Sequence, residues 1–68
     1  MSIKREDTVY FKLKPFDKYP VIKGVVKNRS ANLFWIQMQE IRGKKASGMV
    51  CVGKKNILKK ENKNDTSI

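Results

Sequence analysis

Hydrophobic and polar residues alternate over residues 8–14, near the start of the chain. Three apolar side chains share one side of such an extended segment: Val9, Phe11 and Leu13. Tyr10 and Lys12 fall on the other side. This period of two, built from β-forming residues, predicts a strand with one face toward a core.

Two further strands are predicted over residues 21–27 and 33–39, joined by a polar turn over residues 28–32. Asn and Ser tolerate turn conformations, so the three segments together predict a hairpin. Gly24, inside the earlier strand, indicates a bulge or a sharp bend. The predicted inward side chains of the pair are Ile22, Gly24, Val26, Phe34, Ile36 and Met38.

The second half of the chain predicts shorter elements. Residues 40–47 form a polar, basic loop, and residues 48–52 form another strand. Residues 53–56 suit one turn of 3₁₀ helix, and Ile57 begins a closing strand. Pro15 and Pro20 place a connecting loop between the first two strands, because proline breaks strand pairing.

The pattern therefore predicts an all-β domain of four or five short strands. A small closed or half-open barrel would bury their apolar faces and hide sheet edges. We expect the domain to span residues 8–59. A flexible N-terminus over residues 1–7 would precede it, and a disordered basic tail over residues 60–68 would follow, because the tail lacks the apolar residues that ordering requires.

Charge narrows the range of partners. The chain has 16 Lys and Arg against 6 Asp and Glu, a formal net charge of +10. Such an excess opposes folding by self-repulsion and attracts polyanions, nucleic acid first among them. A pure solubility role is the alternative. The single cysteine, Cys51, and the absence of an apolar leader at the N-terminus predict a reducing, cytoplasmic location.

Catalysis is not expected. The chain has no histidine, so it cannot build a Ser-His-Asp or Cys-His arrangement, and one cysteine cannot hold zinc. Gly43-Lys44-Lys45 lacks the flanking glycines and Ser/Thr of a phosphate-binding loop. We therefore expect no enzymatic activity, no metal and no cofactor.

Short motifs resemble those of small SH3-like barrel proteins, uncharacterised members from low-GC Gram-positive bacteria and their phages and plasmids. The motifs are Val9-x-Phe11-Lys12, Gly24-Val25-Val26 and Lys55-Asn56 before the last strand. A weaker resemblance to the Sm/Hfq-like barrel uses the same glycine strand and the segment 52–57. This chain lacks room for the N-terminal helix of that family. The resemblance implies an SH3-like barrel, a fold that permits nucleic-acid binding without requiring it.

The predicted outward sheet face carries two aromatic residues, Tyr10 and Trp35, among lysines. Aromatic rings stack on bases and lysines follow phosphates, so this face is a candidate nucleic-acid interface. The candidate cations are Lys12, Lys23, Lys27, Arg29, Arg42, Lys44, Lys45, Lys54 and Lys55. A shift of one residue in register would turn Trp35 into the core instead. Lysine is poor at bidentate base recognition, so low sequence specificity is expected.

The alternative function is a protein-interaction module for an acidic partner, which a basic surface would also suit. Met49 and Cys51 would share an outer apolar patch that could be the contact of a homodimer. Membrane association is not expected, because the sequence has no amphipathic helix.

Overall fold

The fold is all-β, as the alternation predicted. The structure is a computed structural model that describes residues 3–14 and 18–61. Its elements, in chain order, are β1 (Thr8–Phe11), β2 (Ile22–Ser30), β3 (Leu33–Ile41), β4 (Lys44–Lys45), β5 (Met49–Gly53), the 3₁₀ turn η1 (Lys54–Asn56) and β6 (Ile57–Lys60). The predicted 3₁₀ turn and the closing strand after it are both confirmed.

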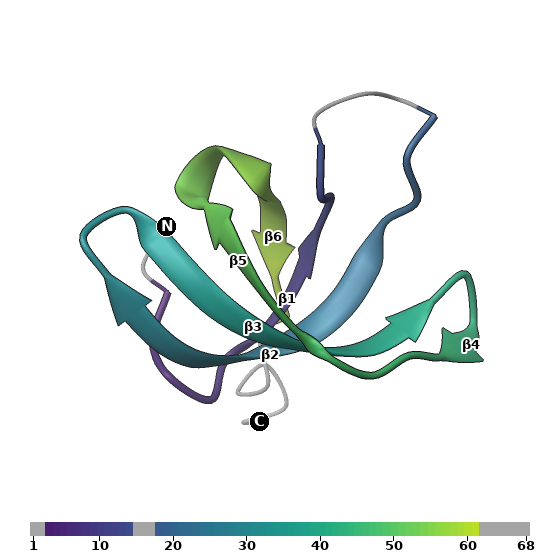
Figure 1. Cartoon of the computed structure of the whole chain (residues 1–68), viewed down its shortest axis with the longest axis horizontal. Coiled ribbons are helices and arrows are strands. Elements are labelled where there is room, and N and C mark those ends of the chain that lie inside the picture. Colours follow the sequence, from purple (N-terminus) through teal and green to yellow (C-terminus); the bar gives the residue numbers. More distant parts are fainter. Residues whose placement is uncertain (1–2, 15–17, 62–68) are drawn as a thin grey trace, which may run out of the picture.

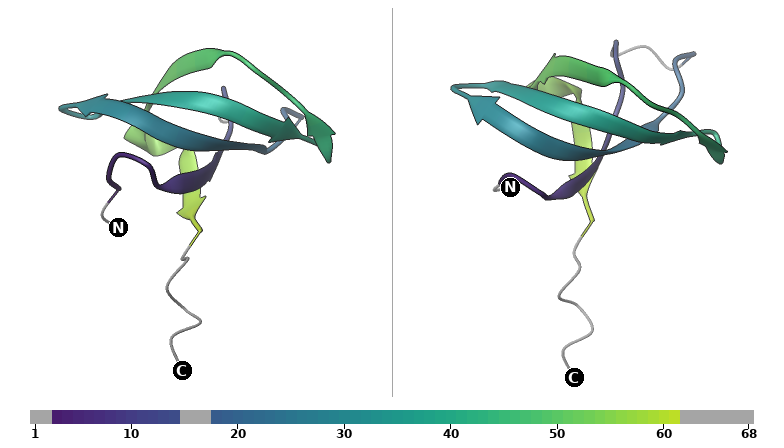
Figure 2. Two further views of the ribbon diagram at one scale, coloured as in Figure 1. Left: turned by 90° about the horizontal axis from the view of Figure 1, so that it is seen from below. Right: turned by 60° about the horizontal axis from the view of Figure 1, so that its bottom comes forward.

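All strand pairs are antiparallel; β1, β2 and β3 follow one another as a meander, and β6 returns to the edge of β1. β6 pairs with β1, β1 with β2, and β2 with β3, while β4 and β5 both pair with the far side of β3. Figures 1 and 2 show β2 and β3 as long curved strands, with β5 beside β3 and with β1 and β6 on the side of β2. The register of β2 on β3 shifts at Lys23/Gly24 and at Val26/Asn28. Such bulges increase the bend of a sheet, so they let five strands enclose a core.

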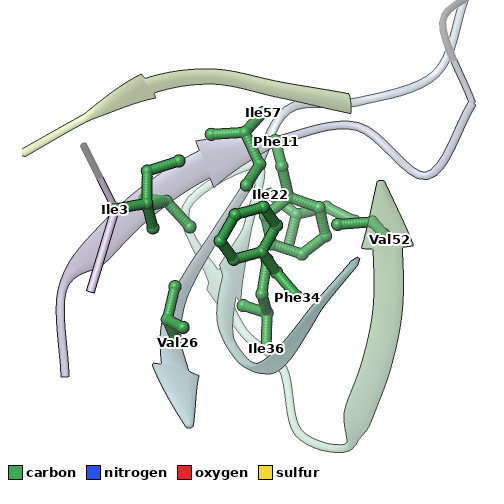
Figure 3. Close-up of a cluster of buried hydrophobic side chains, with 9 residues drawn as sticks. Ile3, Phe11, Ile22, Val26, Phe34, Ile36, Val52 and Ile57 are labelled. Atoms are coloured by element: carbon green, nitrogen blue, oxygen red, sulfur yellow. The ribbon is translucent and has the colours of Figure 1, made fainter. Parts of the chain in front are cut away.

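The core lies inside this curved sheet (Figure 3). Its buried apolar residues are Ile3, Val9, Phe11, Ile22, Val26, Phe34, Ile36, Val52 and Ile57. The inward sets predicted for β2 and β3 are thus placed correctly, with Met38 packed at the margin. Leu13 is an exception, because β1 ends at Phe11 and the Leu13 side chain is 45% exposed. The alternating pattern over residues 8–14 therefore extends three residues beyond the end of β1.

The packed part of the chain begins before Thr8. Ile3 is 3% exposed and belongs to the core. The amide of Glu6 donates to the carbonyl of Val26 (2.7 Å), and the amide of Val26 donates to that of Asp7 (2.9 Å). At the other end Glu61 donates its amide to the Thr8 carbonyl (2.8 Å). Of the tail predicted over residues 60–68, Lys60 belongs to β6, and residues 62–68 lie outside the described residues, as does Pro15.

The segment predicted as a basic loop over residues 40–47 contains a small hairpin. β3 continues to Ile41, which pairs with Lys44 across a two-residue turn. Both turn residues have positive φ, 52° at Arg42 and 80° at Gly43, as a type I′ hairpin turn requires. Arginine rarely adopts this conformation, so the sequence concealed the turn.

The β2–β3 hairpin is closed by Ala31 and Asn32, with Ser30 paired to Leu33. Ala31 has a φ of 52°, a left-handed conformation in which a Cβ is unfavourable by about 1–2 kcal/mol. We expect Ala31→Gly to raise the free energy of unfolding by about 0.5–1 kcal/mol, since the relief exceeds the added chain entropy of glycine. Urea unfolding followed by Trp35 fluorescence measures this. Ala46→Gly, where φ is not positive, is the control and should destabilise; equal losses in both variants would contradict the expectation.

Candidate nucleic-acid interface

Three of the four acidic side chains in the described ranges lie on one side of the molecule, beside lysines of β2 and β6, and the fourth, Glu40, is on β3. Glu6 lies 3.4 Å from Lys27, Asp7 lies 3.6 Å from Lys60, and Glu61 lies 3.9 Å from Lys23. Glu40 faces Lys23 and Lys45 across the strand pairs. Each acid therefore offsets lysine charge on this side. Exposed pairs of this kind contribute little to stability, but they reduce the local positive potential.

Tyr10 sits in the middle of this group, on the outer face of β1. Its hydroxyl donates to Glu61 Oε1 (2.9 Å), and the Lys59 ammonium lies 4.9 Å from the ring centroid. This cation–π contact occupies a face of the ring. Tyr10 and Lys23 were predicted to bind nucleic acid, and the structure places both in an internal polar network that already engages them.

The hydrogen bond to Glu61 raises the pKa of Tyr10 above its ordinary value of about 10, with desolvation and the charges of Glu61 and Glu40 adding to the shift. A raised tyrosine pKa means that the fold favours the neutral phenol. The associated stability is present below pH about 10 and is lost as pH rises through the higher folded-state pKa.

Substituting Glu61→Gln should therefore lower the pKa of Tyr10. Absorbance at the tyrosinate band, taken as the difference between the parent and its Tyr10→Phe variant, isolates Tyr10 from Tyr19. The same difference in the Glu61→Gln background should show an earlier midpoint. An unchanged midpoint would show that Glu61 does not raise the pKa of Tyr10.

Two other predicted cations also have internal partners. Lys27 contacts both carboxylate oxygens of Glu6. Arg29 donates from Nη1 to the carbonyl of Ile3 (2.8 Å), which fastens the N-terminal segment to β2. These side chains support the fold, so their positive charge is not wholly available to a ligand.

Trp35 lies on the outer face of β3 and is half-buried. Its neighbours in the sequence, Phe34 and Ile36, are buried on the inner face. In the sheet Trp35 lies opposite Asn28 on β2 and Cys51 on β5. The Trp35 side chain therefore points outward, as stacking on a base would require.

A second group of cations surrounds η1, at the end of β5 beside the β2–β3 hairpin turn (Figure 1). Asn56 joins η1 to the segment after β1: its Nδ2 donates to the carbonyls of Lys12 (2.8 Å) and Leu13 (3.0 Å). The Lys12 amide in turn donates to the Asn56 carbonyl (3.0 Å). These bonds bring the backbone of Lys12–Lys14 beside Lys54 and Lys55.

We call Lys12, Lys14, Lys54 and Lys55 the η1 lysine cluster. Lys14, Lys54 and Lys55 are exposed, and none of the three forms an ion pair within residues 3–14 and 18–61. The amide of Lys54 donates to the Asn32 carbonyl (3.0 Å), so the cluster rests on the hairpin turn as well. Lys14 was not among the predicted site residues. Its place depends on the long-range Asn56 brace, for which the sequence has no signal.

The remaining predicted cations, Arg42, Lys44 and Lys45, lie at the β3–β4 turn. Figure 1 shows β4 at the far end of β5 from η1. The predicted cations and Tyr10 are therefore divided among three places: the acid-bearing side, the β4 turn and the η1 lysine cluster. Trp35 lies on the outer face of β3.

Comparison with known proteins finds no matching family model, no matching curated protein and no matching solved structure. Among the described residues, no three His, Cys, Asp or Glu side chains form a group that could hold a metal ion. The described part of the chain also contains no helix with the length and hydropathy of a membrane span.

Proposed function

We propose that this protein binds nucleic acid without enzymatic activity, through contacts between lysines and phosphates and with low sequence specificity. The observation that carries the proposal is the separation of charge. Glu6, Asp7 and Glu61 lie beside lysines over β1, β2 and β6, whereas Lys14, Lys54 and Lys55 are exposed to solvent at the η1 end. A group of exposed ammonium groups attracts a phosphate chain, and without such a chain the lysines repel one another.

Lysine chemistry sets the expected mode of binding. An ammonium group is a compact point charge that contacts phosphate but does not form bidentate hydrogen bonds with base edges. Trp35 adds a half-buried aromatic ring on the outer face of β3, where a base could stack. Affinity should therefore depend strongly on salt and weakly on base sequence.

Fluorescence anisotropy with labelled oligonucleotides tests the proposal. Two unrelated sequences, each single-stranded and duplex, are titrated over a series of salt concentrations. With three or four phosphate contacts, log K should fall with log salt at a slope of roughly −2 to −4, and the two sequences should bind alike. Absence of binding at low salt would refute nucleic-acid binding. Equal competition by poly-glutamate would favour the alternative, an acidic protein partner.

A further inference from the structure

One edge of β5 is open. β5 pairs with β3, and no other strand of the described residues lies on its opposite side. The Met38 amide donates to the Gly48 carbonyl (2.8 Å), and the Lys54 amide donates to the Asn32 carbonyl (3.0 Å). These two bonds show which residue pairs of β3 and β5 are hydrogen-bonded pairs. Hydrogen-bonded and non-hydrogen-bonded pairs alternate in antiparallel sheets. Val50 and Val52 therefore direct their backbone groups to β3, and Met49, Cys51 and Gly53 direct theirs outward.

This edge has none of the usual protection. Exposed edge strands in native proteins carry lysine, proline or a bulge that prevents pairing with another chain. β5 reads Met-Val-Cys-Val-Gly, without a charge or a proline, and Met49 is 55% exposed. β6, at the other edge of the sheet, carries Lys59 and Lys60, and its register with β1 shifts between Tyr10 and Phe11. The protected edge and the open edge are thus different strands.

We propose that β5 pairs antiparallel with β5 of a second copy of this chain, around a two-fold axis at Cys51. Each strand then supplies the outward backbone groups of Met49, Cys51 and Gly53 to the other. Met49 lies opposite Gly53 of the second copy, and each Cys51 lies opposite its equivalent. The sheets of the two copies become continuous, and the outer face with Trp35 stays exposed.

The charge pattern favours this symmetric pairing over pairing of β5 with β6. β5 is a neutral strip in a chain of net charge +10. In the two-fold register Lys54 lies opposite Gly48 of the second copy, so the lysines at the two ends of β5 do not face each other. Pairing with β6 would instead bring the charged residues Lys59 and Lys60 onto this neutral edge. A contact one strand wide is smaller than the roughly 1,200 Å² of standard interfaces, so the dimer is weak.

Salt distinguishes this association from the proposed function. Two chains of the same charge repel each other, so added salt should strengthen the dimer. Added salt weakens contacts to phosphate. The dimer needs no nucleic acid, and either proposal can fail without the other.

Cys51 is the only cysteine, so a single nitroxide label on it reports the pairing in the otherwise unaltered chain. Directly opposed residues in a hydrogen-bonded pair have Cα atoms about 5.5 Å apart. We expect dipolar broadening that grows with protein over roughly 10 µM to 1 mM, where weak complexes dissociate, and that grows with salt. Sedimentation equilibrium of the unlabelled chain over the same range should show a monomer–dimer equilibrium.

Met49→Lys adds a charge to the open edge and should abolish both signals. Leu58→Lys is the matched control, because Leu58 on β6 is equally exposed (52%) and the added charge is the same. It should leave most of the dimer intact, and circular dichroism verifies that both variants fold. A monomer at all concentrations would overturn the proposal. Dimers without dipolar broadening, or equal loss in both variants, would also overturn it, because another surface would then be responsible.

Discussion

Replacing Gly24 by alanine should remove a large part of the protein's free energy of unfolding. A Cβ on Gly24 would lie 2.6 Å from Ile36 Cγ2 and 2.7 Å from the carbonyl oxygen of Gln37. Ile36 is fully buried and Gln37 contributes backbone, so neither atom can withdraw without moving β3. Overpacking of this kind costs about 1–3 kcal/mol. A chain of this length has about 3–10 kcal/mol of total stability.

Gly53→Ala provides the matched control. A Cβ there would have its nearest neighbours at 3.9 Å, an ordinary contact distance. Urea unfolding followed by Trp35 fluorescence should show a loss of at least 2 kcal/mol, about the middle of the overpacking range, for Gly24→Ala and little change for Gly53→Ala. Similar midpoints for the two variants would mean that β2 and β3 are not packed in the register described above.

Removing three charges from the η1 lysine cluster should weaken nucleic-acid binding far more than removing three charges elsewhere. The test variant is K14Q/K54Q/K55Q, and the control is K23Q/K27Q/K60Q, which has the same net charge. Each lysine–phosphate contact adds about 0.7–0.9 to the salt slope. The test variant should therefore lose roughly 2–3 from that slope, with affinity reduced by at least tenfold near physiological salt.

The control variant should retain most of the salt slope, because its lysines already lie within 4 Å of Glu61, Glu6 and Asp7. Anisotropy titrations of both variants against the parent make the comparison. Equal losses would mean that net charge alone drives binding. A larger loss in the control would place the interface over β1, β2 and β6 instead.

Period-two alternation was sufficient to predict the fold class and the inward faces of β2 and β3. Those faces depend only on local geometry, since side chains alternate along any strand. Leu13 was misplaced because alternation cannot show where a strand ends. β1 ends where the Asn56 side chain donates hydrogen bonds to the carbonyls of Lys12 and Leu13.

The candidate site was less predictable than the fold, because charge compensation depends on contacts between distant residues. Tyr10 meets Glu61 across 51 positions, and Lys27 meets Glu6 across 21. In the sequence alone, Lys27 cannot be distinguished from Lys54 or Lys55. The burial of Ile3 was hidden for the same reason, since one apolar residue among charged neighbours shows no period. Tertiary structure therefore determines which lysines have an acidic partner and which are exposed without one.

Amide chemical shifts of the labelled protein, recorded during titration with a short oligonucleotide at low salt, test the central claim most directly. The claim is that nucleic acid binds at the η1 end of the molecule. We expect the largest shift changes at residues 12–14 and 54–56, with smaller changes at Trp35 and reversal when salt is added. Changes centred on β1, β2 and β6, or no changes at all, would contradict it.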